Sequence, residues 1–328
     1  MKNDYISEIH EKDKLVLHPY EDLKDRGTYN RKLIVKSDNI YLYDENGKRY
    51  IDGPGGMWCN NIGHGNKEIA EAIKNQIETM DYCSPFSESS EKAAELASVL
   101  SELSPGDLNT VFFTPDGSSA NETALRFMML YNNILGRPEK KHIISRDQAY
   151  HGSTYLTASI TGKDREKNNF DFESTFIHHV GSPNPYRRKD NQTVDDFCDE
   201  KVKEFEDKIL EIGPNKVAAY IAEPVLASGG CIVPPKNYIK RFWEICKKYD
   251  VLYISDEVVT AFGRLGHFFS SEKEFDIIPD IITTAKGITS GYIPLGAVLI
   301  SDKLINQISK DSTMLYHGFT YSGHPVCC

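Results

Sequence analysis

Two charged residues of this sequence stand directly after short apolar runs, at points where buried strands of a parallel sheet would end. Asp256 follows VLYIS, and Lys286 follows DIITTA. A carboxylate at the rim of a buried strand needs a cationic partner, and a partly desolvated lysine amine suits Schiff-base chemistry. Their spacing of about 30 residues matches neighbouring strands joined by a crossover. The alternatives are a solvated loop carboxylate and an ordinary surface lysine.

Two other segments offer groups that would hold a phosphate and a planar ring. Gly117 and Ser118 open a predicted helix after TVFFTPD, and the free N–H groups at a helix start bind phosphate. A simple N-cap is the alternative for the same residues. Tyr150, His151 and Gly152 follow another apolar run, which places the tyrosine ring in a glycine-flanked loop where it can stack on a planar ligand.

The rest of the sequence predicts the scaffold that must position these groups. Short β runs around an Asn46-Gly47 turn predict a hairpin-rich opening over residues 33–52. Apolar periodicity predicts helices near residues 66–80 and 90–103. Over residues 110–301, compact apolar runs alternate with amphipathic stretches, the pattern of an α/β domain with a mostly parallel sheet flanked by helices. Such a sheet collects ligand-binding groups at the carboxyl ends of its strands.

Composition narrows the class of protein. The 328 residues include 38 Lys and Arg against 48 Asp and Glu, which gives a formal charge of −10. No block of Lys and Arg is long enough to contact successive phosphates of a nucleic acid, so nucleic acid is disfavoured as a partner. No apolar run approaches the ~20 residues that span a bilayer, and the start MKNDYISEIHEKDK lacks the features of a signal peptide. We therefore expect a soluble, cytoplasmic protein without membrane contact. Seven cysteines without a C-x-x-C pair favour free thiols and disfavour a metal site.

A phosphate cradle, a stacking ring, a carboxylate and a strand-end lysine, in that order, are what pyridoxal 5′-phosphate requires. At this point the sequence resembles the class III (ω-) aminotransferases, from about residue 33 onward. The matching segments are GPGGMWCNNIGHG (53–65), FFTPDGSSANETALR (112–126), AYHGST (149–154), AEPVLASGG (222–230), YISDEVVTAFGRLG (253–266), PDIITTAKGITSGYIPLGA (279–297) and HGFTYSGHP (317–325). The resemblance implies the large domain of a fold-type-I pyridoxal-phosphate transferase, with the N-terminal part of a small α+β domain.

The resemblance also implies roles for single residues. Lys286 would form the Schiff base with the cofactor and shuttle the substrate proton, and Asp256 would pair with the protonated pyridine nitrogen. These two are the expected catalytic residues. The expected cofactor-binding residues are Gly117, Ser118, Tyr150, His151, Glu223, Asp256, Lys286 and Thr320.

Three of the implied roles concern the edges of the site. Thr320 is expected to reach the phosphate of a neighbouring subunit, which would make the protein a homodimer with shared sites. Trp58 and Tyr150 are expected to wall the substrate pocket. For Glu223, a contact near the cofactor ring and a strand-end carboxylate bonded to backbone are equal alternatives.

The implied activity is a pyridoxal-phosphate-dependent transamination. An amine or ω-amino acid, of the β-alanine, taurine or diamine type, would give its amino group to an α-keto acid, with pyruvate the expected acceptor. The family's phosphate segment is commonly N-S-G-S-E-A-N, whereas Asp116 stands here at its second position and would repel phosphate unless it turns away to cap the helix. Ser228 replaces a glutamate of the ornithine and 4-aminobutyrate branches, which favours the pyruvate-dependent branch.

The same resemblance implies a domain organisation. We expect residues 1–58 to be the N-terminal segment of the small domain, 59–322 the pyridoxal-phosphate-binding large domain, and 323–328 the start of a truncated connecting helix, with the C-terminal small domain absent. A chain truncated in this way is expected to show little activity. The alternatives are another class III reaction, an aminomutase or decarboxylase, and an inactive cofactor-binding or dimerisation fragment. No G-x-G-x-x-G follows a strand, which disfavours a dinucleotide-binding dehydrogenase.

Overall fold

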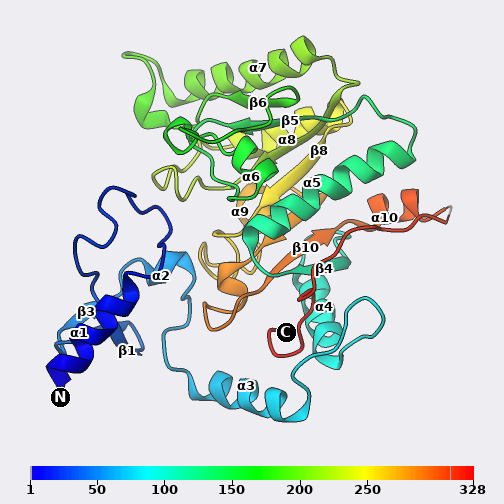
Figure 1. The fold of residues 1–328 in the computed structure, drawn as a ribbon. Helices are drawn as coiled ribbons and strands as arrows, with labels where there is room; N and C mark the ends of the chain where they lie inside the picture. The colour runs from blue at the N-terminus through cyan, green and yellow to red at the C-terminus, as the bar shows by residue number, and fades with distance from the viewer. Residues whose placement is uncertain (1, 311) are drawn as a thin grey trace.

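The computed structural model describes residues 2–310 and 312–328, and a seven-stranded sheet forms its centre (Figure 1). The strands of this sheet are β4 (Thr110–Thr114), β5 (His142–Arg146), β6 (Ile177–Val180), β7 (Val217–Ala222), β8 (Leu252–Asp256), β9 (Ile281–Thr284) and β10 (Gly296–Ile300). Their order across the sheet is β4-β10-β9-β8-β7-β5-β6. Every residue of β7 is buried, as expected for a strand that is covered on both faces.

The sheet is mostly parallel, which confirms the predicted α/β class. The strands β6, β5, β7, β8 and β9 run parallel to one another. β10 is the exception, because it pairs antiparallel with both β9 and β4. In the register of β8 and β9, Asp256 stands opposite Thr283. The carboxyl ends of these two strands therefore reach the same edge of the sheet.

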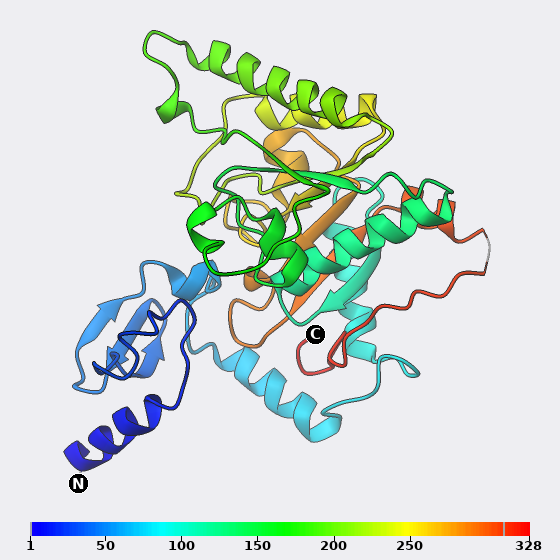
Figure 2. The same ribbon diagram turned by 45° about the horizontal axis from the view of Figure 1, so that its top comes forward.

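Helices cover both faces of the central sheet (Figures 1 and 2). Those that belong to this body are α4 (Glu91–Leu103), α5 (Gly117–Ile134), α6 (Tyr155–Ile160), α7 (Val194–Ile212), α8 (Tyr238–Lys248), α9 (Ser270–Phe275) and α10 (Asp302–Ile308), with 3₁₀ turns η1 (Asp164–Glu166), η2 (Pro185–Arg187) and η3 (Lys286–Ile288). On β7, Ile221 packs in one cluster with Met128 of α5, whereas the adjacent Tyr220 packs with Phe205 of α7 and Phe242 of α8. The alternation of side chains along the strand thus separates two core layers.

The N-terminal segment lies beside the central body in both views (Figures 1 and 2). It contains α1 (Lys2–Asp13) and a small antiparallel sheet of β1 (Ile34–Asp38), β2 (Tyr41–Asp44) and β3 (Arg49–Ile51). The turn between β2 and β3 includes Gly47 at φ 81°, so the predicted hairpin is present. The short helix α2 (Gly55–Trp58) and helix α3 (Lys67–Thr79) follow. Between them the Asn61 N–H donates to Ser290 Oγ over 2.9 Å, which ties this segment to the central body.

Residues 323–328 form turns rather than a helix, although the Cys328 N–H donates to the His324 carbonyl over 3.1 Å, the bond of a first helical turn. The domain boundaries at residues 58 and 322 stay predictions. Among the helices that the structure describes, none has the length and apolar character needed to cross a membrane.

Candidate active site

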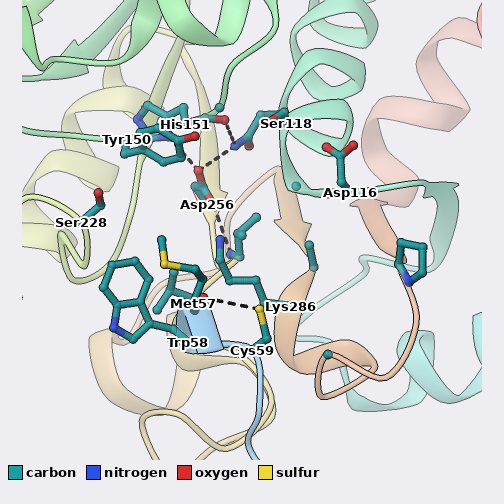
Figure 3. Close-up of a pocket in the computed structure, with 18 of the residues that line it drawn as sticks. Met57, Trp58, Cys59, Asp116, Ser118, Tyr150, His151, Ser228, Asp256 and Lys286 are labelled. Atoms are coloured by element: carbon teal, nitrogen blue, oxygen red, sulfur yellow. Dashed lines mark hydrogen bonds and ion pairs between the residues drawn. The ribbon is translucent and has the colours of Figure 1, made fainter. Parts of the chain in front are cut away.

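A cavity of about 750 Å³ opens at the carboxyl ends of β8 and β9. Asp256 is the last residue of β8, and Lys286 lies two residues after the end of β9. In Figure 3 the Lys286 side chain extends into the pocket toward Asp256, with Tyr150 on one side and Trp58 on the other. The predicted site residues that line this cavity are Trp58, Gly117, Ser118, Tyr150, His151, Glu223, Asp256 and Lys286.

The Asp256 carboxylate is buried and held by three donors. His151 Nδ1 lies 2.7 Å from Oδ2, and Asn121 Nδ2 donates to the same oxygen over 2.7 Å. The Val258 N–H donates to Oδ1 over 3.1 Å. These three contacts fix the position of the Asp256 carboxylate at the floor of the pocket.

Asn121 is a residue of this site that sequence reasoning did not single out. Its Nδ2 also donates to the His151 carbonyl over 2.7 Å, and its Oδ1 accepts from Thr283 Oγ over 2.6 Å. One side chain of α5 thus joins the ends of two strands and the loop after β5. Asn121 lies inside the segment FFTPDGSSANETALR, but its contact with Asp256 spans 135 residues, and no local pattern reveals such a contact.

The start of α5 presents free N–H groups to the pocket. Asp116 is its N-cap, because its Oδ1 accepts the Ser119 N–H over 2.8 Å, and in Figure 3 its carboxylate points away from Asp256. The N–H groups of Gly117 and Ser118 have no hydrogen-bond partner among the described residues. A Cβ on Gly117 would stand 2.9 Å from Val258 Cγ1, so only glycine lets the helix start pack this closely.

Lys286 adopts a left-handed backbone conformation, with φ 48°. This conformation costs a non-glycine residue about 1–2 kcal/mol and is typical of functional sites. The residue after it also needs close packing, because a Cβ on Gly287 would stand 2.5 Å from Asn61 Nδ2. The turn that directs Lys286 into the pocket is therefore supported by the segment that follows α2.

Glu223 follows β7 and is buried. Its Oε1 accepts the Tyr150 N–H over 2.9 Å, and its Oε2 accepts the Ala227 N–H over 3.0 Å. Burial raises the pKa of Glu223. Glu223 thus lines the pocket, and backbone N–H groups bond both of its carboxylate oxygens. One of these N–H groups belongs to Tyr150, which carries the predicted stacking ring. A contact between Glu223 and the cofactor ring stays a prediction.

Thr320 does not line this cavity. It is exposed, and its carbonyl accepts the Tyr82 hydroxyl over 2.9 Å. Its expected place at a neighbouring subunit's phosphate stays a prediction. No group of three or more His, Cys, Asp or Glu residues within residues 2–310 and 312–328 has metal-binding geometry.

Sequence reasoning also missed a polar group on the outer side of the pocket. Tyr20, Lys163, Arg165 and Glu166 line the cavity together with Ser228. In Figure 3, Ser228 lies well away from Lys286 and Asp116. The residues of this group come from the N-terminal segment, from the stretch after α6 and from the loop after β7, so their contact depends on tertiary structure alone.

The fold is that of the fold-type-I transaminases. A solved (S)-enantioselective omega-transaminase from Thermomicrobium roseum superposes with a TM-score of 0.95 at 39% identity, covering 98% of this chain and 72% of that one. The omega transaminase of Pseudomonas jessenii, solved in complex with PMP, gives a TM-score of 0.94 at 39% identity over 97% and 72% of the two chains.

The chain belongs to the family described as aminotransferase class-III, whose model matches residues 25–328. A γ-aminobutyrate transaminase of Oryza sativa subsp. indica is 39% identical over 90% of this chain and 58% of its own length. A putrescine–pyruvate aminotransferase of Pseudomonas aeruginosa is 38% identical over 94% and 68%. The chain thus spans about three fifths to two thirds of the length of these relatives. The predicted resemblance to class III aminotransferases is confirmed.

Proposed function

We propose that this protein is a pyridoxal-phosphate-dependent aminotransferase that moves an amino group from an amine or ω-amino acid to an α-keto acid, with pyruvate as the acceptor. The observation that carries the proposal is the placement of Lys286 and Asp256 at the ends of neighbouring parallel strands, facing one pocket. Membership of the class III family supports the reaction type.

The residues of the pocket fit this cofactor. The unpaired N–H groups of Gly117 and Ser118, at the positive end of an 18-residue helix, suit a phosphate. The Asp256 carboxylate suits a protonated ring nitrogen, because it is buried with hydrogen-bond donors but has no Lys or Arg partner in the described chain. The capping role of Asp116 reduces the expected conflict with phosphate, since its carboxylate is bonded to its own helix, but its negative charge stays near the phosphate end of the site.

Bound pyridoxal phosphate supplies an aldehyde that exchanges amino groups and a ring that withdraws electrons from the substrate carbon. Asp256 would hold the positive charge on the ring nitrogen. Lys286 would hold the aldehyde carbon covalently and, once released, would carry the proton that leaves the substrate carbon. Tyr150, positioned through its N–H by Glu223, would cover one face of the ring, and Trp58 would bound the substrate on the other side.

Covalent trapping tests this proposal. Protein loaded with pyridoxal phosphate and reduced with borohydride should carry the pyridoxyl group on Lys286, as read by peptide mass mapping. Unreduced protein loaded with the cofactor should convert pyruvate to alanine in the presence of an amine donor, and borohydride reduction should abolish this activity. A label on another lysine, or absence of covalent label, would contradict the assignment. Lys163→Arg, which keeps the charge of the second lysine in the pocket, serves as the labelling control.

We also propose that the active form is a homodimer in which Thr320 of each chain completes the phosphate site of the other. The exposed position of Thr320, outside its own pocket, supports this arrangement. Thr320→Ala should weaken pyridoxal-phosphate binding without a change of dimer mass in light scattering. A monomeric protein with full cofactor affinity would contradict it.

A further inference from the structure

Lys163 places a second amine in the pocket, on the side away from Asp116. Its side chain is 9% exposed. Its Nζ contacts Ser228 Oγ and lies 3.2 Å from Glu166 Oε1. The same nitrogen lies 5.2 Å from the centroid of the Tyr150 ring. Lys163 therefore lies beside the predicted stacking ring and lines the same cavity as Lys286.

The charges on this side of the pocket do not balance. Lys163 and Arg165 contribute two cations, and Glu166 is the carboxylate that contacts both, at 3.2 Å and 3.9 Å. The other Glu166 oxygen accepts the Tyr20 hydroxyl over 3.1 Å. Ser228, the remaining neighbour of Lys163, is neutral. The formal charges of Lys163, Arg165 and Glu166 therefore sum to one positive unit. The Arg165 side chain is 83% exposed, so solvent screens its charge, and Lys163 is the buried cation of this group.

The other carboxylates of the cavity do not compensate this charge. Asp116 caps α5, Glu223 accepts two backbone N–H groups, and Asp256 accepts from His151, Asn121 and Val258. Lys163 has three N–H donors, and the described residues take up two of them, at Glu166 and Ser228. The third can meet a ligand.

We propose that Lys163 binds the anionic end of the amino donor, so that the preferred donors are ω-amino acids with a terminal carboxylate or sulfonate, rather than diamines. This inference rests on the proposed aminotransferase function and selects among its donor classes. A partly buried ammonium group forms strong charge-assisted hydrogen bonds with an anion. A second ammonium group on the donor would instead meet two like charges, which costs binding energy.

The first test compares three four-carbon donors that differ only at the distal end: 4-aminobutyrate, n-butylamine and 1,4-diaminobutane, each with pyruvate. In a ping-pong reaction the donor's kcat/KM is independent of the acceptor. Lys163→Met should lower kcat/KM for 4-aminobutyrate roughly ten- to hundredfold and leave n-butylamine within about threefold. The value for 1,4-diaminobutane should rise. A uniform effect on all three donors would overturn the proposal.

Lys167→Met is the matched control, because Lys167 belongs to the same stretch of chain but does not line the cavity. It should leave the ratio of the three donors unchanged. A change of that ratio equal to the one in Lys163→Met would show that the segment, rather than the Lys163 charge, determines donor preference.

The second test does not depend on turnover. Calorimetric titration with butyrate, an unreactive carboxylate of the same length, should show binding to the native chain that weakens at least tenfold in Lys163→Met and persists in Lys167→Met. Equal affinity in all three proteins, or no binding to the native chain, would overturn the inference. If none of the three amines reacts while butyrate binding depends on Lys163, the proposed function fails and the anion site stands.

Discussion

The imidazole of His151 and the carboxylate of Asp256 form a buried pair, with Nδ1 and Oδ2 2.7 Å apart and the two side chains 0% and 3% exposed. The other ring nitrogen, Nε2, lies 3.1 Å from Ser145 Oγ at the end of β5. A chain of contacts thus runs from one strand end to another beneath the pocket. Both residues also line the cavity that contains Lys286.

Asp256→Asn should keep the fold and the covalent link to Lys286 while it lowers kcat by roughly 10²- to 10⁴-fold, because a neutral amide cannot stabilise a positive ring nitrogen. The amide oxygen can still accept from His151 and Asn121, but the amide NH₂ group replaces the oxygen that accepts the Val258 N–H, so the melting temperature should fall moderately. Steady-state kinetics and circular dichroism measure the two effects. A variant with near-native turnover would assign the role of Asp256 to another group.

Asn121→Ala should reduce activity at least tenfold and lower the free energy of unfolding by about 1–3 kcal/mol, because the carboxylate of Asp256 and the carbonyl of His151 each lose a donor. Asn132→Ala offers a control, since Asn132 is equally buried on the same helix and bonds the Met128 carbonyl. This control should lose stability but keep its turnover. Equal activity losses in the two variants would show that the loss of helix stability, rather than the contacts of Asn121 with Asp256 and His151, reduces activity.

Asp116→Asn should bind pyridoxal phosphate about three- to tenfold more tightly, because it removes a negative charge near the phosphate end of the site and keeps an efficient helix cap. Asp116→Ala removes the cap as well and should lower the free energy of unfolding by about 1 kcal/mol. Fluorescence titration of the cofactor and urea denaturation of the cofactor-free chain give the two quantities. Unchanged cofactor affinity in Asp116→Asn would mean that the capping geometry already shields the phosphate.

His179 should make stability depend on pH. Burial, with a smaller effect from Lys167, lowers the pKa of His179 from 6.5 to about 4. The unfolded chain therefore takes up a proton before the folded chain does, and stability decreases as the pH falls from about 6.5 to 4, by about 1–3 kcal/mol in total. His179→Gln should flatten the dependence of the urea midpoint on pH over this range. The same slope in wild type and His179→Gln would contradict the prediction.

Much of the fold was predictable because it depends on local patterns. The helices near residues 66–80 and 90–103 appear as α3 and α4, and the apolar runs appear as buried strands. Asp256 and Lys286 could be singled out because each directly follows an apolar run of the sequence, at the end of β8 and two residues after β9. The capping alternative for Asp116 was also local, since cap and bonded N–H are three residues apart. Apolar periodicity and helix caps involve residues that are close in the sequence, so both can be recognised from the sequence alone.

Tertiary structure decided the contacts between distant segments. The antiparallel placement of β10 between β4 and β9 follows from sheet pairing that no single segment specifies. Asn121 reaches Asp256 across 135 residues, and Lys163 reaches Ser228 across 65. These polar pairs form only because apolar packing on both faces of the sheet brings their backbones together, and the energy of that packing is spread over many side chains. The sequence by itself therefore determined the class of scaffold and the candidate pair of Asp256 and Lys286. The neighbours that orient Asp256, and the charged groups around Lys163, required the folded chain.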